Sequence, residues 1–178
     1  MKRSLAALVF LLGTAAPSRA YIDSSLTLGK LIADANNIVV LRVDKVSREK
    51  QVVVFTKVAD LKGKDAPEVV KHKLTDGSHP RQARTVLDWA EPGAVAIWFR
   101  AGNVSETCIG GYWYECAASE APWWTMTRGK PELCYTYRGS TGKLRDHVTA
   151  ILDGKEVVIT ALKYAAFDPG KGERKTSL

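Results

Sequence analysis

The hydrophobic pattern of residues 21–166 changes repeatedly between two periods, and this change predicts an α+β fold. Apolar residues recur at helical spacing in three segments, 28–35, 83–90 and 144–152. Segments 38–46 and 51–61 are rich in β-branched residues and predict two long strands. Shorter apolar, aromatic or alternating runs predict further strands at 68–74, 94–100, 112–116, 133–137 and 155–162. We therefore expect five to seven mainly antiparallel strands that form a small barrel or a strongly bent sheet, with about three peripheral helices.

Two details of this pattern predict local topology. The polar run 47–50 separates two long strand-like segments, as a hairpin turn would. The run from Ala94 to Arg100 is continuously apolar, which is typical of a strand buried on both faces. We expect this run to be the central strand of the sheet.

The two ends of the chain do not follow the pattern of the centre. Lys2 and Arg3 precede an apolar run from Leu5 to Leu12, and Ser18-Arg19-Ala20 resembles a cleavage site, so residues 1–20 are predicted to be a secretory signal peptide. Residues 21–166 are predicted to be one globular domain, and 167–178 a linker-like tail, which is typical either of a segment of a larger protein or of a natural frayed terminus. The predicted location is secreted, periplasmic or in the cell envelope, with no membrane span after cleavage.

Signal cleavage also changes the charge of the chain. The formal charge of +7 falls to +4 when Lys2, Arg3 and Arg19 are removed, and part of that excess lies in the tail. This near balance and the predicted export argue against nucleic acid as the partner.

Aromatic residues are concentrated between positions 112 and 137. Large rings of this kind can stack on sugars or anchor a protein partner, so this segment is the predicted binding site. The alternative is a second small core in which the same rings fill irregular space. The candidate binding residues are Tyr112, Trp113, Tyr114, Trp123, Trp124, Tyr135 and Tyr137.

Cysteine and histidine positions offer little catalytic chemistry. Cys108, Cys116 and Cys134 permit at most one disulfide within the chain, and no C-x-x-C pattern indicates a metal or redox site. The histidines, at 72, 79 and 147, have no metal-binding spacing. We expect neither a metal nor a cofactor, although a small hydrolase could still assemble its site from these distant histidines.

The stretch from Ala35 to Val43, the strand 52–58 with the corner Asp60-Leu61-Lys62-Gly63, and the strand 93–99 resemble netrin-like and metalloproteinase-inhibitor-like domains. The resemblance implies an oligonucleotide/oligosaccharide-binding (OB)-like barrel. Inhibitors of that family begin with a zinc-chelating cysteine, whereas Tyr21 begins the mature chain here, so their mechanism is not implied.

The segment from Cys108 to Cys116, with Trp123 and Trp124 after it, resembles N-terminal modules of uncharacterised bacterial envelope proteins. That likeness includes both cysteines, and two glycines lie between them. A Cys108–Cys116 disulfide is therefore preferred, with Cys116–Cys134 as the alternative.

Together these features favour an exported, non-enzymatic binding or interaction module whose partner is a protein or a glycan of the extracytoplasmic space. The alternatives are the small secreted hydrolase and a barrel that binds single-stranded nucleic acid on its aromatic residues.

Overall fold

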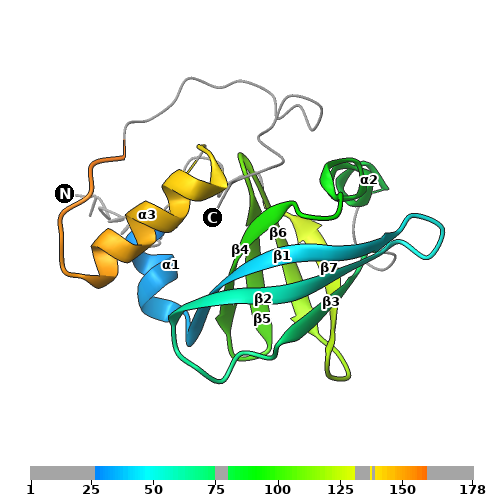
Figure 1. Cartoon of the computed structure of the whole chain (residues 1–178), viewed down its shortest axis with the longest axis horizontal. Helices are drawn as coiled ribbons and strands as arrows, with labels where there is room; N and C mark the ends of the chain where they lie inside the picture. Colours follow the sequence, from blue (N-terminus) through cyan, green and yellow to red (C-terminus); the bar gives the residue numbers. More distant parts are fainter. Residues whose placement is uncertain (1–26, 75–79, 131–136, 138, 160–178) are drawn as a thin grey trace, which may run out of the picture.

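The computed structural model describes residues 27–74, 80–130, 137 and 139–159. In this part of the chain three helices accompany seven strands (Figure 1). The helices are α1 (Leu28–Asp34), α2 (Pro80–Trp89) and α3 (Thr141–Leu152). The strands are β1 (Asn37–Ser47), β2 (Val52–Lys62), β3 (Val69–Lys73), β4 (Val95–Ala101), β5 (Val104–Ile109), β6 (Tyr112–Ala118) and β7 (Trp123–Gly129).

The seven strands close into a barrel in the order β1-β2-β3-β7-β6-β5-β4. Neighbouring strands are antiparallel except for β3 and β7, which run parallel. The predicted small α+β, OB-like barrel is confirmed, and so is the hairpin between its first two strands. Because the barrel is closed, each of the seven described strands has a hydrogen-bonded neighbour on both sides.

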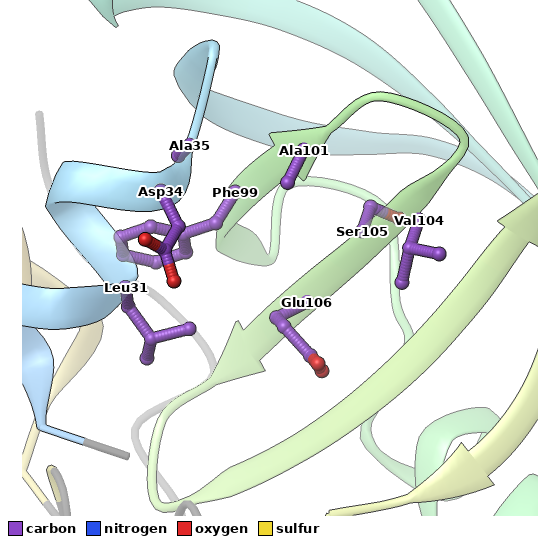
Figure 2. A pocket seen from close by; sticks show the side chains of 8 residues that line it. All are labelled: Leu31, Asp34, Ala35, Phe99, Ala101, Val104, Ser105 and Glu106. Carbon is purple, nitrogen blue, oxygen red and sulfur yellow. The ribbon is translucent and has the colours of Figure 1, made fainter.

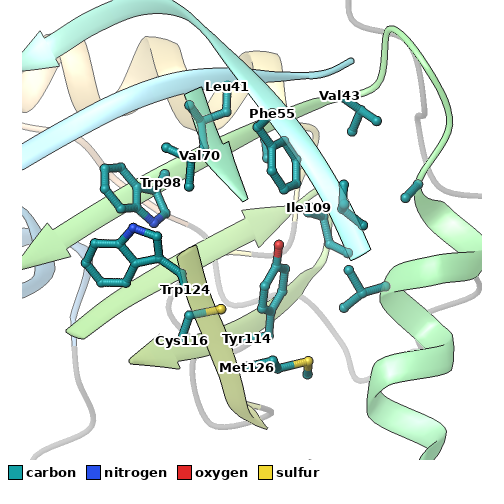
Figure 3. Packing of buried hydrophobic residues seen from close by; sticks show 14 of the residues in the cluster. Leu41, Val43, Phe55, Val70, Trp98, Ile109, Tyr114, Cys116, Trp124 and Met126 are labelled. Carbon is teal, nitrogen blue, oxygen red and sulfur yellow. The ribbon is translucent and has the colours of Figure 1, made fainter. Parts of the chain in front are cut away.

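Inward-facing side chains fill the barrel, because alternate residues of each strand point to the same side. Trp98 of β4 meets Trp124 of β7 with ring centroids 5.1 Å apart, and Tyr114 and Met126 pack below them (Figure 3). One face of α2 joins this core through Val86, Leu87 and other residues, and so closes one end of the barrel.

A second core lies outside the barrel, between its wall and two helices. The outward residues Ile97 and Phe99 of β4 pack with Leu31 of α1 and Leu144 of α3. Strand β4 is therefore buried on both faces, as predicted for the run 94–100, but it is not a central strand, because a closed barrel has none. Helices α1 and α3 lie together on this side of the barrel (Figure 1).

Helix ends follow simple capping rules. Thr27 Oγ1 accepts the backbone N–H of Lys30 at the start of α1, and Ser140 Oγ accepts that of Lys143 at the start of α3. These bonds satisfy N–H groups that the first helical turn leaves without partners, and they fix where each helix begins.

Gly63 forms the tight corner after β2. Its φ of +71° is disfavoured for residues with a side chain, and a Cβ atom here would lie 2.6 Å from the carbonyl oxygen of Asn36. Asn37 then donates from Nδ2 to Asp65 Oδ1 at 2.6 Å, and Arg100 contacts Asp65 Oδ2 at 2.7 Å. The corner therefore ties β1, β4 and the segment after β2 together at one end of the barrel.

The strand prediction was incomplete in the second half of the chain. Strands β5 and β7 were not predicted, since Thr, Glu and Arg interrupt their apolar residues. Residues 155–159 form no strand, contrary to the prediction for 155–162, and residues 160–162 lie outside the described residues. The predicted strand 133–137 also lies almost entirely outside them, as do the predicted signal peptide and tail.

Candidate functional site

The predicted aromatic site is divided between the two sides of the barrel wall. Trp113 packs in the outer core, Tyr114 and Trp124 point into the barrel, and Tyr137 is also buried. Tyr112 and Trp123 are partly exposed, and Tyr135 lies outside the described residues. Buried rings cannot stack on a ligand, so Trp123 is the predicted tryptophan whose position suits recognition.

Trp123 ends a row of outward side chains that crosses four strands. Strand register aligns Lys45 of β1 with Val54 of β2, Val54 with Lys71 of β3, and Lys71 with Trp123 of β7. Residues adjacent to three of these, Phe55, His72 and Trp124, are buried inside the barrel, so the row itself faces outward. Arg42 on β1 and Lys73 on β3 are the next outward residues on either side of this row. We call the following six residues the Trp123 face: Arg42, Lys45, Val54, Lys71, Lys73 and Trp123.

Charge on the Trp123 face is strongly one-sided. It carries four basic residues, and Asp44, in the bulge of β1 beside Lys45, is an exposed carboxylate next to them. Within the described part of the chain, Arg42 and Lys45 form no ion pair, and the Lys71 ammonium contacts the Trp123 ring without forming an ion pair. The Lys71 ammonium lies 5.1 Å from the centre of the Trp123 ring, a cation–π geometry.

A small hollow lies on the other side of the molecule, between α1 and the outer faces of β4 and β5 (Figure 2). Its volume is about 140 Å³, and its walls are Leu31, Asp34, Ala35, Phe99, Ala101, Val104, Ser105 and Glu106. The Asp34 carboxylate lies on the α1 side of the hollow, whereas the Glu106 carboxylate points away from α1 (Figure 2). Sites for small molecules and cofactors typically enclose about 300–1,000 Å³, so this hollow is too small for such a ligand.

A cluster of charges covers the outer wall beside this hollow. Lys130 Nζ bridges Glu106 Oε1 at 3.0 Å and Glu115 Oε2 at 2.9 Å. The two carboxylates lie opposite each other on β5 and β6. Thr127 Oγ1 donates to the other oxygen of Glu115 at 2.6 Å, whereas Glu106 Oε2 is buried without a hydrogen-bond partner.

Because their hydrogen-bond partners differ, the carboxyl groups of Glu106 and Glu115 have different pKa values. Burial raises the pKa of Glu106 to about 7, and the hydrogen bond and positive charge of Lys130 offset only part of the effect. Burial also raises the pKa of Glu115, but hydrogen bonds from Thr127 and Lys130 outweigh it, so this pKa is below its usual value. Glu106 therefore titrates near neutral pH while Glu115 stays ionised.

The described histidines do not form a catalytic group. His72 is fully buried in the barrel, where its Nδ1 lies 2.8 Å from the Tyr114 hydroxyl, and burial lowers its pKa to about 3. His147 on α3 packs edge-on against Tyr137. His79 lies outside the described residues.

The preferred Cys108–Cys116 disulfide is wrong. Cys108 pairs across the sheet with Trp113 and belongs to the outer core, whereas Cys116 pairs with Ser105 and points into the barrel. Two side chains on opposite faces of a sheet cannot reach disulfide geometry. Cys116 is a buried free thiol, and Cys108 Sγ donates to the carbonyl of Gly110 at 3.0 Å. The alternative partner, Cys134, lies outside the described residues.

Comparisons of the chain with protein-family models, with curated proteins and with solved structures gave no match. Among the described residues, no group of three or more His, Cys, Asp or Glu side chains is placed to hold a metal ion. None of the helices in that part of the chain is both long and apolar enough to cross a membrane.

The Trp123 face could not be predicted from the sequence, because the pairing that brings its residues together is not apparent in the hydrophobic pattern. Lys71 and Lys73 alternate with buried residues of β3, which indicates an outward pair. Trp123, however, lies on a strand that the hydrophobic pattern did not predict, so its register with Lys71 was not accessible.

Proposed function

We propose that this protein is an exported binding module that holds a glycan or a protein partner on the Trp123 face. The observation that carries the proposal is the row Lys45-Val54-Lys71-Trp123, in which a partly exposed indole lies beside cations that have no carboxylate partner in the described structure. Unpaired charges next to an aromatic surface are a common basis for recognition, because the partner supplies the missing counter-charge while the ring supplies contact area.

The arrangement of the fold supports this location. Helices α1 and α3 cover the outer side of β4, and α2 closes one barrel end, whereas the Trp123 face has no described helix packed on it (Figure 1). The rigid strands beneath would hold the row in a fixed geometry, which lowers the entropic cost of binding.

The two described histidines do not favour the hydrolase alternative. One contacts a tyrosine deep inside the barrel, and the other packs against a tyrosine under α3. Neither is placed beside a carboxylate or a thiol, as a general base that activates a nucleophile would require.

Binding to immobilised ligands tests the proposal. The exported chain would be applied to a panel of neutral and acidic polysaccharides and to extracytoplasmic protein from its host. The wild-type chain is expected to be retained by at least one of them, and Trp123→Ala to lose that retention.

Val104→Ala is the matched control, because it removes an exposed apolar side chain from β5, a strand that does not belong to the Trp123 face. Equal retention of the Trp123→Ala variant and the wild-type chain on every ligand would contradict the proposal.

A further inference from the structure

The contact between Lys71 and Trp123 restricts the chemistry of any ligand on this face. The Lys71 ammonium lies over the indole, 5.1 Å from its centre, and forms no ion pair with a described residue. A ligand that uses both groups must therefore present an anionic group directly beside a flat apolar surface.

Further cations surround this pair at regular spacing. Lys73 lies two residues further along β3, which corresponds to about 6.6 Å, and Lys45 lies two strands away, which corresponds to about 10 Å. Arg42 adds a fourth positive charge, and Asp44 is an exposed carboxylate next to Lys45 in β1. The surface therefore suits a ligand with repeated negative charges rather than a single one.

On the premise of the binding function proposed above, we propose that the Trp123 face binds an acidic saccharide. The apolar C–H face of a sugar ring covers the exposed part of Trp123. A carboxylate or sulfate on the same or the next sugar contacts Lys71, and further acidic groups along the chain contact Lys73 and Lys45. The recognised chemistry is a flat ring with an anionic substituent, repeated along a polymer.

Two other polyanions share part of this chemistry but match the face less well. Single-stranded nucleic acids stack successive bases on several aromatic side chains, and Trp123 is the aromatic residue of this face. Acidic peptides supply carboxylates but no flat ring for the indole, so they would gain from the cations alone. The saccharide is the class that uses the cations and the indole together.

Titration calorimetry at low salt with four short oligomers tests the inference. The first two probes are acidic, a galacturonate oligomer and a sulfated glucose oligomer. The others are the methyl-esterified galacturonate oligomer, which keeps the rings but loses the charge, and polyglutamate, which keeps the charge but loses the rings. At least one acidic saccharide is expected to bind more tightly than both of the latter.

Variants separate the two parts of the face. Trp123→Ala is expected to weaken saccharide binding by about fivefold or more, the lower end of what stacking on one aromatic ring contributes. It should leave polyglutamate binding unchanged. The double variant Lys45→Ala/Lys71→Ala should weaken both by about tenfold and reduce their salt dependence. Lys143→Ala/Lys155→Ala removes the same charge outside the Trp123 face and should change neither.

The remaining outcomes overturn the inference in different ways. If neither acidic saccharide binds, or if polyglutamate binds equally well and Trp123→Ala has no effect, the acidic-saccharide assignment fails. An oligothymidylate is titrated as a fifth probe, and if it binds more tightly than both saccharides, the ligand is a nucleic acid. If the esterified oligomer binds as well as the acidic one and still depends on Trp123, the acidic specificity fails while the binding function stands.

Discussion

Replacing Glu106 by glutamine is expected to remove a pH-dependent loss of stability. A carboxyl group whose pKa rises from 4.5 to about 7 on folding is harder to ionise in the folded protein than in the unfolded chain. At about 1.4 kcal/mol for each pKa unit, the full difference is about 3 kcal/mol. The side chain is only 13 % exposed, so solvent screening removes little of it.

The sign follows from counting bound protons. Between pH 4.5 and about pH 7 the unfolded chain has released the Glu106 proton and the folded protein still holds it, so the free energy of unfolding falls as the pH rises. Above that range both states are ionised and the loss is constant. Glutamine has no proton to release and can still accept a hydrogen bond from Lys130.

The measurement is the difference in unfolding free energy between Glu106→Gln and wild type, from urea titrations. A difference is needed because His72 acts in the opposite direction. Its pKa is lowered from 6.5 to about 3, so the unfolded chain binds the extra proton and the stability due to His72 rises with pH over that interval. This contribution is common to both proteins and cancels.

The variant should gain about 2–3 kcal/mol relative to wild type between about pH 5 and about pH 8. Glu49→Gln, in the exposed turn between β1 and β2, is the control for removing a carboxylate away from Glu106. Glu115→Gln should instead lose stability relative to wild type as the pH rises through the acidic range, because folding lowers the pKa of that group. A flat difference for Glu106→Gln would refute the reasoning, since it would mean that Glu106 is ionised as easily in the folded as in the unfolded state.

Three further predictions concern packing. Trp124→Ala should cost about 3–5 kcal/mol in urea unfolding because it empties a buried aromatic site against Trp98, whereas Trp123→Ala should cost less than about 1 kcal/mol; similar costs would contradict the assignment of inner and outer faces. Gly63→Ala should destabilise by more than about 2 kcal/mol, and an unchanged urea midpoint would argue against the positive φ at this corner. Cys116 should react with iodoacetamide only in denaturant, because it is inaccessible and burial raises the pKa of its thiol; mass mapping that found rapid labelling in the native protein would contradict this.

The sequence was informative wherever one period extended over a whole element. The long strands β1 and β2, their hairpin, the doubly buried β4 and the three helices follow directly from apolar spacing. His72 lies inside the barrel and Trp113 and Tyr114 lie on opposite faces of β6, in agreement with the alternation of side chains along a strand. Periodicity was sufficient here because the inward or outward position of each side chain follows from its neighbours within the same helix or strand.

Prediction failed where strand pairing decides the outcome. In β5, Ser105 and Thr107 face inward where an apolar residue would be expected, so the strand lacks a clear alternating pattern. The disulfide prediction assumed that Cys108 and Cys116 flank a flexible loop, but the glycines form a tight β5–β6 hairpin that places them on opposite faces of the sheet. Strand register depends on how two strands pair. The hydrophobic pattern of a single sequence shows where strands occur but not how they pair.

The outer wall of the barrel explains why recognition is assigned to one side of it. In β4 the outward residues Ile97 and Phe99 are as apolar as the inward ones, and this side becomes stable only because α1 and α3 bury it. In β3 the outward residues Lys71 and Lys73 flank a buried histidine, so this strand needs no covering helix to remain soluble. The proposed binding function requires an outer face that is polar and is supported by rigid strands. The outward cations of β3 meet that requirement, and Trp123 lies in register with the first of them.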